Sequence, residues 1–170
     1  MPKSLFRAAI ANSGDGMAAI EYLAELCGTS LTATAIRYAK LCDDSVAVVC
    51  STGDKIDFAF MSDSLRARQD LTWIRKGTGL TAHCATARFN RDTSNVLNAR
   101  RISSTANLGD WFTGGDGDVN EEVVGLGEYG RTLTVLWADD LIDPAENEEA
   151  PENEDEMLLP SERFYRKSRY

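Results

Sequence analysis

The sequence predicts an α+β fold. An N-terminal helix-turn-helix-like unit of three helices over residues 1–42 is followed by a small, mainly antiparallel sheet domain with covering helices over residues 43–138. Apolar residues recur at helical spacing as far as Cys42 and change to short runs of strand length from Val46 onward. Residues 139–170 begin with a proline-containing, strongly acidic segment without periodicity, so we expect an acidic, flexible tail.

Three short helices are predicted in the helical unit. The first follows Pro2, because proline suits the first turn of a helix. The second is expected to start after Asp15 as its N-cap and to end at Gly28, and Ser30 is expected to cap the third. The tight turn between the last two helices is typical of a helix-turn-helix unit.

A helix-turn-helix unit raises DNA binding as one interpretation, with the third helix in the recognition position. Four side chains on this helix are expected to be exposed and are candidate contacts to DNA or to a protein partner: Thr32, Thr34, Arg37 and Lys40. Only two of them are basic, and the side chains of residues 1–41 sum to a charge of about +1, which neutralises few phosphates. A scaffold or protein-docking role is therefore favoured over DNA contact.

Two strand hairpins are predicted in the sheet domain. Residues 46–50 and 56–60 form the first, around a turn at Gly53, and residues 119–124 and 131–137 form the second. In the last strand, alternation places Leu133, Val135 and Trp137 on one face. Glu121 and Glu122 are expected to lie on a solvated strand face or in a turn.

The segment between the hairpins is less regular. We expect a helix capped near Ser62 that continues to the cations before Gly77, and then a β-prone stretch over residues 81–90. Residues 94–106 fit either a helix or a strand. If residues 81–90 form a strand, the single histidine, His83, points away from Cys84, so the two are poorly placed to share a metal or to form a catalytic pair.

Motifs for catalysis or cofactor binding do not occur in the sequence. There is no HExxH zinc motif, no GxSxG nucleophile elbow and no phosphate-binding P-loop, so we expect neither enzymatic activity nor a cofactor. Four cysteines in apolar contexts are interpreted as buried small hydrophobes in a reducing compartment: Cys27, Cys42, Cys50 and Cys84. No secretory signal and no apolar run near the ~20 residues of a membrane helix are found, so we expect a cytoplasmic protein without a membrane partner.

Several segments resemble the ImmA/IrrE family of zinc metallopeptidases. The stretch that follows the family's third metal-ligand helix is similar to MPKSLFRAAI, and its helix-turn-helix is similar to LAELCGTSLTATAIRYAKL. The first hairpin of the family's C-terminal domain resembles DSVAVVCSTGDKI, and later parts of that domain resemble WIRKGTGL and GEYGRTLTVLW. The resemblance covers about residues 1–137 and is carried by the combination of segments.

The resemblance implies a non-catalytic half, because the HExxH helix and the downstream glutamate ligand are absent and no catalytic residue carries over. Family members cleave a repressor-type transcription factor in mobile-element control or a stress response. We therefore expect a regulatory module, either a fragment or a stand-alone regulator, with a peptidase half or a repressor as protein partner and a small molecule as signal. The alternative is a helix-turn-helix DNA-binding regulator.

The C-terminal domain of some members is GAF-like, and such a domain would hold a ligand between its sheet and covering helices. Four aromatic side chains are candidates for lining this pocket: Phe58, Phe60, Trp73 and Trp111. Aromatic residues at these spacings are more often part of a hydrophobic core.

Overall fold

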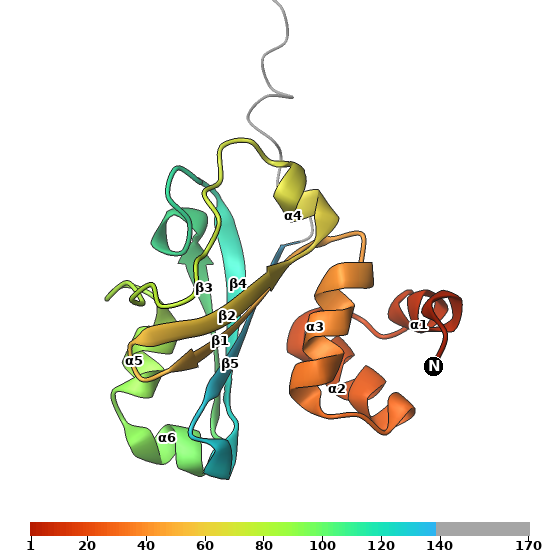
Figure 1. Ribbon diagram of the computed structural model, residues 1–170, viewed down its shortest axis with the longest axis horizontal. Helices are drawn as coiled ribbons and strands as arrows, with labels where there is room; N and C mark the ends of the chain where they lie inside the picture. The colour runs from red at the N-terminus through yellow and green to blue at the C-terminus, as the bar shows by residue number, and fades with distance from the viewer. Residues whose placement is uncertain (139–170) are drawn as a thin grey trace, which may run out of the picture.

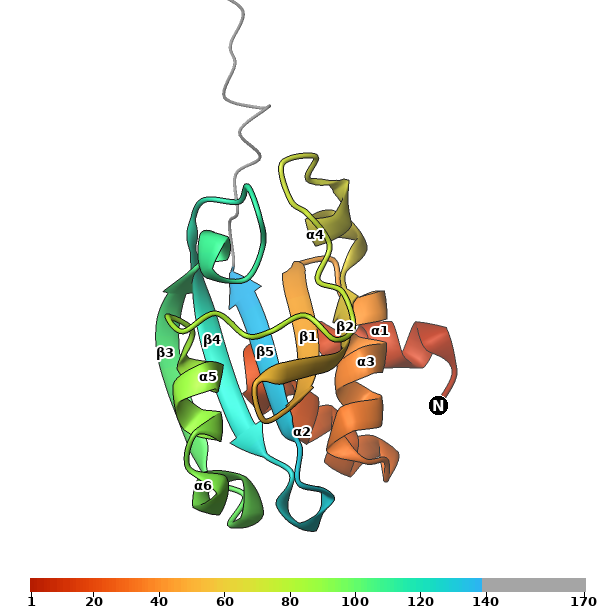
Figure 2. The same cartoon turned by 60° about the vertical axis from the view of Figure 1, so that its left-hand side comes forward.

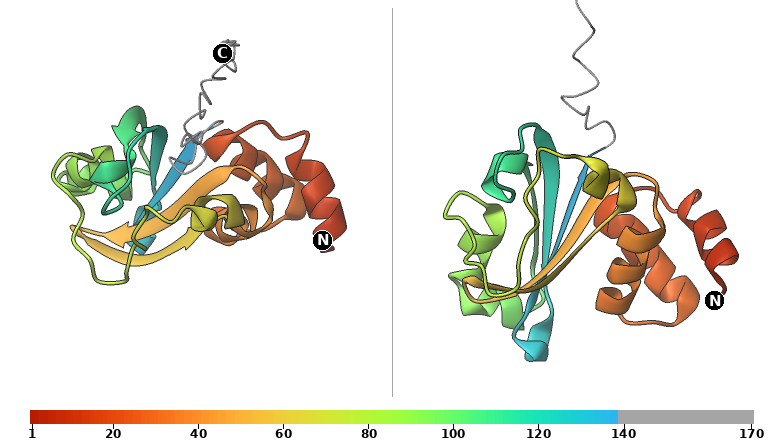
Figure 3. Two further views of the ribbon diagram at one scale, coloured as in Figure 1. Left: turned by 90° about the horizontal axis from the view of Figure 1, so that it is seen from above. Right: turned by 45° about the horizontal axis from the view of Figure 1, so that its top comes forward.

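The computed structural model describes residues 1–138, and it shows an α+β fold built on one five-stranded antiparallel sheet (Figure 1). The strand order is β2-β1-β5-β4-β3. Helices α1 to α3 cover one face of the sheet, and α5 and α6 lie over the other (Figure 3). Leu65 of α4 also packs on this second face, with Ala47 and Leu136. The predicted tail, residues 139–170, lies outside the described residues.

The three predicted N-terminal helices are confirmed as α1 (Lys3–Ile10), α2 (Gly16–Cys27) and α3 (Leu31–Leu41). Gly28 adopts the left-handed conformation that ends α2, with φ of 62°. Ser30 accepts the backbone N–H of Ala33 and so caps α3. Asp15 occupies the N-cap position of α2, but its side chain makes no capping hydrogen bond.

Both predicted hairpins are present. Strands β1 (Ser45–Thr52) and β2 (Lys55–Met61) form the first, and β4 (Asp118–Gly125) and β5 (Thr132–Ala138) form the second. They are joined into one sheet by the antiparallel pairing of β1 with β5, in which Val48 lies opposite Val135. The fifth strand, β3 (Arg101–Asn107), pairs with β4 at the other margin of the sheet.

One hydrophobic cluster joins the helical unit to the sheet, and a second apolar cluster lies on the opposite face of the sheet. Ile20, Leu23 and Tyr38 from the helices pack with Val48 and Leu133 from the sheet, and each of the five is at most 1% exposed. The helices of residues 1–42 and the sheet therefore bury their apolar faces against each other.

The segment between the hairpins differs from the prediction. Helix α4 (Asp63–Ala67) stops well before Gly77, because Arg68 leaves the helical conformation. The β-prone stretch contains a helix, α5 (Ala85–Asn90), so the predicted strand around His83 is wrong. The ambiguous stretch contains both alternatives, with α6 (Thr93–Leu97) followed by β3. Two 3-10 turns, η1 (Leu108–Asp110) and η2 (Gly127–Tyr129), complete the elements.

The adjacent acids of β4 are not both solvated, which corrects the expectation for this strand. Glu121 is fully buried, and its carboxylate accepts the backbone N–H groups of Ala85 and Thr86, at 3.0 and 2.7 Å, together with the Thr86 hydroxyl. Glu122 points to the opposite face and accepts the backbone N–H of Met17 at 2.6 Å. Each glutamate therefore satisfies the N-terminal amides of a helix on its own side of the sheet.

No helix within residues 1–138 has both the length and the apolar character that crossing a membrane requires.

Candidate functional site

The candidate site is a pocket on the face of the sheet that carries α4 to α6. It has a volume of about 260 Å³ and lies between residues 72–81 and residues 109–113. Figure 2 shows the first of these segments crossing in front of the sheet, with the loop of residues 108–117 above it. Side chains of different chemistry line the pocket: Ile56, Trp73, Arg75, Leu80, Thr81 and Trp111.

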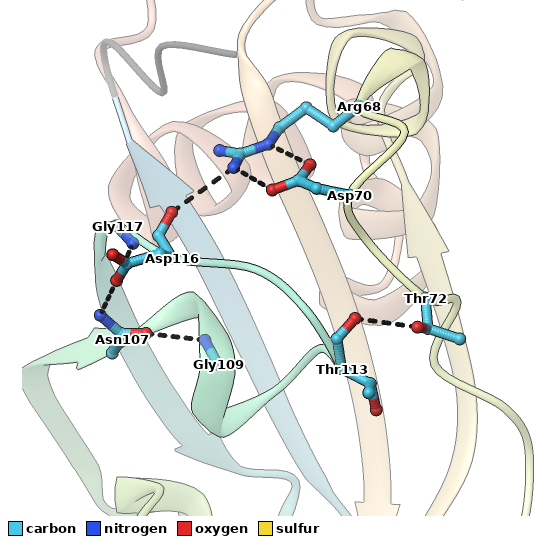
Figure 4. Close-up of polar contacts among 8 residues, drawn as sticks. All are labelled: Arg68, Asp70, Thr72, Asn107, Gly109, Thr113, Asp116 and Gly117. Atoms are coloured by element: carbon cyan, nitrogen blue, oxygen red, sulfur yellow. Dashed lines mark hydrogen bonds and ion pairs between the residues drawn. The ribbon is translucent and has the colours of Figure 1, made fainter. Parts of the chain in front are cut away.

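A buried ion pair next to the pocket lining joins the two loops (Figure 4). Together with the neighbouring contacts of Thr72, Thr113 and Asp116, we call it the rim. The Arg68 guanidinium donates two hydrogen bonds to the Asp70 carboxylate, Nε to Oδ1 at 3.0 Å and Nη2 to Oδ2 at 2.6 Å. The same Nη2 also donates to the backbone carbonyl of Asp116 in the second loop, at 3.4 Å. The Arg68 side chain is only 4% exposed, so this contact fixes the start of the crossing segment.

A second link between the loops lies directly on the pocket wall. The Thr72 hydroxyl and backbone N–H both donate to the Thr113 carbonyl, at 2.8 and 3.1 Å. Thr81, farther along the same segment, donates its hydroxyl to the Asp110 carbonyl at 2.6 Å. The pocket is thus framed by hydrogen bonds at both ends of its opening.

Two glycines permit this close approach. A Cβ at Gly114, whose φ is 95°, would lie 2.5 Å from the Asp70 carbonyl oxygen. A Cβ at Gly115 would lie 2.3 Å from Cδ2 of Leu71. At Gly114 the obstacle is backbone, so the loop can approach Asp70 only because this position lacks a side chain, whereas at Gly115 it is the tip of the Leu71 side chain.

The acids of the rim are held in their charged form. Hydrogen bonds from Arg68 lower the pKa of Asp70 below its ordinary value. Asp116 accepts the side-chain amide of Asn107 and its neighbour's N–H at Gly117, and these contacts lower its pKa as well. Asn107 also caps the 3-10 turn η1 through Gly109, which ties the strand end to the loop (Figure 4).

The structure brings two of the four predicted pocket residues together. Trp73 and Trp111 both line the pocket. Trp73 is 55% exposed, and the Arg66 guanidinium lies 4.7 Å from its ring centre. The indole N–H of Trp111 is buried and makes no hydrogen bond to any residue that the structure describes.

The other two predicted pocket residues lie on the opposite face, which corrects the expectation that all four share one site. Phe58 and Phe60 project from β2 toward the side of α3, with their rings edge to face at 5.8 Å. Lys40 lies 4.6 Å above the Phe60 ring. Ile56 of the same strand does line the pocket, because the pairing of β2 with β1 shifts register between Phe58 and Ile56.

Helix α3 presents only part of the exposed polar face that was predicted: Lys40 is exposed, whereas Thr32 and Arg37 are half-buried. Thr34 is 1% exposed, and its hydroxyl bonds to the Ser30 carbonyl and the Thr29 hydroxyl, so its predicted exposure is wrong. Arg37 lies 4.4 Å above the Phe6 ring, and Lys40 covers Phe60. Thr32 is partly buried beside a different cavity. The helix packs on the sheet and uses both of its cations in ring contacts.

The buried cysteines are poor nucleophiles. Burial raises the pKa of the Cys42 thiol to about 12 and that of Cys50 to about 11, and it also raises the pKa of Cys84. Cys84 instead acts as the N-cap of α5 by accepting the N–H of Ala87. Within residues 1–138, no group of three or more His, Cys, Asp or Glu side chains is placed to hold a metal ion.

Sequence reasoning missed the polar residues that build the rim: Arg68, Asp70, Thr72, Thr113 and Asp116. They lie far apart in the sequence, on loops, and no motif links them. The Gly114–Gly115 pair was the available signal, since adjacent glycines often mark a close approach of two backbones.

Comparison with known protein families finds no family model that matches this chain, and comparison with curated proteins finds no match.

Proposed function

We propose that this chain is a non-catalytic regulatory domain that binds a small ligand in the pocket lined by Trp73 and Trp111. The observation that carries the proposal is the pocket itself, in which two tryptophans from distant segments meet beside a buried indole N–H that lacks a protein acceptor within the described residues. A mostly apolar cleft with a few convergent polar groups is the usual form of a ligand site.

The dimensions and lining of the pocket favour a small, flat ligand. Its 260 Å³ lies just below the ~300–1,000 Å³ of typical ligand sites, which suits a molecule of one or two rings. Trp73 offers an exposed ring for stacking, and Trp111 offers a donor for a carbonyl or ring nitrogen. Arg75, also in the lining, adds a cation that favours a ligand with a partial or full negative charge.

The regulated target in this proposal is an ImmA/IrrE-type peptidase that cleaves a repressor. The support is the set of sequence segments that resemble the non-catalytic half of that family, together with an α+β fold consistent with a sensory domain. Residues 1–138 also carry nearly balanced side-chain charges, 16 acidic and 14 basic, which favours a protein or small-molecule partner over DNA.

Tryptophan fluorescence tests the ligand site directly, because the chain has three tryptophans and Trp137 lies on the other face, where it donates to Glu122. In a Trp137→Phe variant, only the two pocket rings report. Compounds that raise the melting temperature in a thermal-shift screen should also change this fluorescence. Trp111→Phe should weaken their binding by about tenfold or more, because it removes the donor and leaves the ligand's acceptor unpaired.

The Trp137→Phe variant is the control and should bind the same compounds as the parent. A compound that binds equally well to the parent and to a Trp73→Ala, Trp111→Phe double variant would place the ligand elsewhere and contradict the proposal. The peptidase link has its own test. Adding the chain to a purified ImmA/IrrE-type catalytic half should change the rate of repressor cleavage, and an unchanged rate at saturating concentration would reject that target.

A further inference from the structure

The two edge strands of the sheet, β2 and β3, differ in whether other segments bond to their outer backbone groups. The outer edge of β2 is covered at its start, around Lys55 and Ile56, by residues 77–80. Ile56 donates its N–H to Thr78 at 2.9 Å, and Leu80 donates to Asp54 at 2.8 Å. At the opposite margin, β3 pairs with β4, and no strand within residues 1–138 pairs with its outer side. Figure 2 shows β3 as the outermost strand on the left of the sheet.

The pairing with β4 identifies which backbone groups of β3 face outward. Gly125 donates to the Arg100 carbonyl, and Leu108 donates to the Gly117 carbonyl, so the even-numbered residues of this stretch form the bonded pairs. In an antiparallel ladder the bonded residues alternate with residues that turn their N–H and C=O to the other side. Arg101, Ser103 and Thr105 therefore direct their backbone groups away from the sheet.

The side chains of this edge do little to protect it. Natural edge strands are usually blunted by lysine, proline, a bulge or a cover. Residues 102–107 contain no charged residue and no proline, and their pairing with β4 has no register shift. Arg101 is the one cation of β3, and Glu21 of α2 already forms an ion pair with it. Ser103 and Thr105 are exposed.

Antiparallel pairing of β3 with a second copy of itself fits these features. With Ser103 on the two-fold axis, Ser103 lies opposite Ser103 of the second copy, and Arg101 lies opposite its Thr105. The three outward-facing residues of each copy then exchange about six backbone hydrogen bonds. No two like charges face each other, and each Arg101 keeps its partner Glu21.

We propose that the chain self-associates through β3, joining two five-stranded sheets into one continuous antiparallel sheet across a two-fold axis at Ser103. An isologous contact of this kind closes after two copies. One edge strand buries less than the ~1,200 Å² of a stable interface, so the dimer belongs to the weak, concentration-dependent class.

Sedimentation equilibrium of the full chain, over concentrations up to the millimolar range, tests this proposal. The parent should show a reversible monomer–dimer equilibrium. Ser103→Pro removes an outward N–H that the β4 ladder does not use, and it should weaken association by about tenfold or more. Ser103→Ala keeps the N–H and should associate like the parent.

A charge exchange at the same position makes the register itself testable. Ser103→Lys or Ser103→Glu alone places two like charges on the axis, so each variant should be monomeric, whereas an equimolar mixture should recover association. Ser103 is exposed, so both variants should keep the parent's circular dichroism spectrum. A parent that stays monomeric at every concentration overturns the proposal, as does association that none of these variants weakens. A mixture that stays monomeric overturns the register.

Discussion

The two faces of the sheet are built on different principles. The face under α1 to α3 is closed by apolar packing, and residues such as Leu23 and Ile20 are fully buried there. The face under α4 to α6 has its own apolar cluster around Leu108, Phe112 and Leu136, but polar links join its loops and frame a pocket of about 260 Å³. Close packing fills the centre of the first face, and a cavity of about 390 Å³ lies beside Leu31 and Leu126 at its margin. On the second face, directional hydrogen bonds can hold an opening in shape. We infer that the first face supplies stability and the second supplies the site.

The largest expected effect comes from the packed face. Leu23→Ala should reduce the free energy of unfolding by about 2–5 kcal/mol, because Leu23 is completely buried and its removal leaves a cavity. Leu26→Ala on the same helix is the matched control, since Leu26 is 50% exposed, and it should change stability by less than about 0.5 kcal/mol. Urea denaturation followed by circular dichroism measures both. Equal losses in the two variants would contradict the assigned packing of α2.

A smaller loss is expected where the second face carries a buried charge. Glu121→Gln keeps the shape of the side chain but replaces one of the two accepting oxygens by an amide NH₂, which then faces the N–H of either Ala85 or Thr86. The expected cost is about 2 kcal/mol, from charge-assisted hydrogen bonds that are lost. Hydrogen exchange should show faster exchange in α5 than in α2. Uniform acceleration across both helices would show that Glu121 supports the whole fold rather than α5.

The rim of the pocket should respond more locally still. Arg68→Lys keeps the charge but cannot form the two-pronged contact with Asp70, so we expect a loss of about 1 kcal/mol. The fluorescence of Trp73 and Trp111 should shift because the crossing segment is released. Arg91→Lys, on an exposed residue, is the control and should leave both readouts unchanged. Unchanged pocket fluorescence in Arg68→Lys would show that the ion pair does not determine the shape of the pocket.

The smallest effect is a pH dependence that belongs to the rim. The folded-state pKa of Asp70 is lowered by Arg68, so its contribution to stability is fully present above the unfolded-state pKa and is lost as pH falls through the folded-state value. Asp70→Asn should therefore destabilise the chain near neutral pH and have little effect at strongly acid pH. Thermal melts from neutral to acid pH measure this difference. A constant difference across the range would exclude the ionised Asp70 as its source.

Local patterns in the sequence were sufficient for much of the fold. The caps at Gly28 and Ser30 and the alternation through Leu133, Val135 and Trp137 predicted elements that the structure confirms. Prediction failed over residues 62–106. There α4 ends where Arg68 contacts a loop nearly 50 residues away in the sequence. Helix α5 starts where the Glu121 carboxylate of β4 accepts hydrogen bonds from its first backbone N–H groups. Periodicity carries no information about such partners.

The candidate site shows the same division. The sequence identified four aromatic residues as pocket candidates. Only the packing of the folded chain decided that Trp73 and Trp111 share a pocket while Phe58 and Phe60 lie on the other face of the sheet. The sequence also identified Arg37 and Lys40 of α3 as candidate contacts. Only the folded structure shows that both side chains lie over aromatic rings.

By itself, the sequence determined the three helices, the two hairpins and the near neutrality of residues 1–138, because caps, turns and alternation act over a few residues. Tertiary structure alone decided the roles of Glu121 and Glu122, adjacent residues whose carboxylates satisfy helices on opposite faces. It also decided the pocket and the open edge at β3, since each depends on which distant segments meet. The physical reason is that a buried polar group must find a partner wherever the fold provides one.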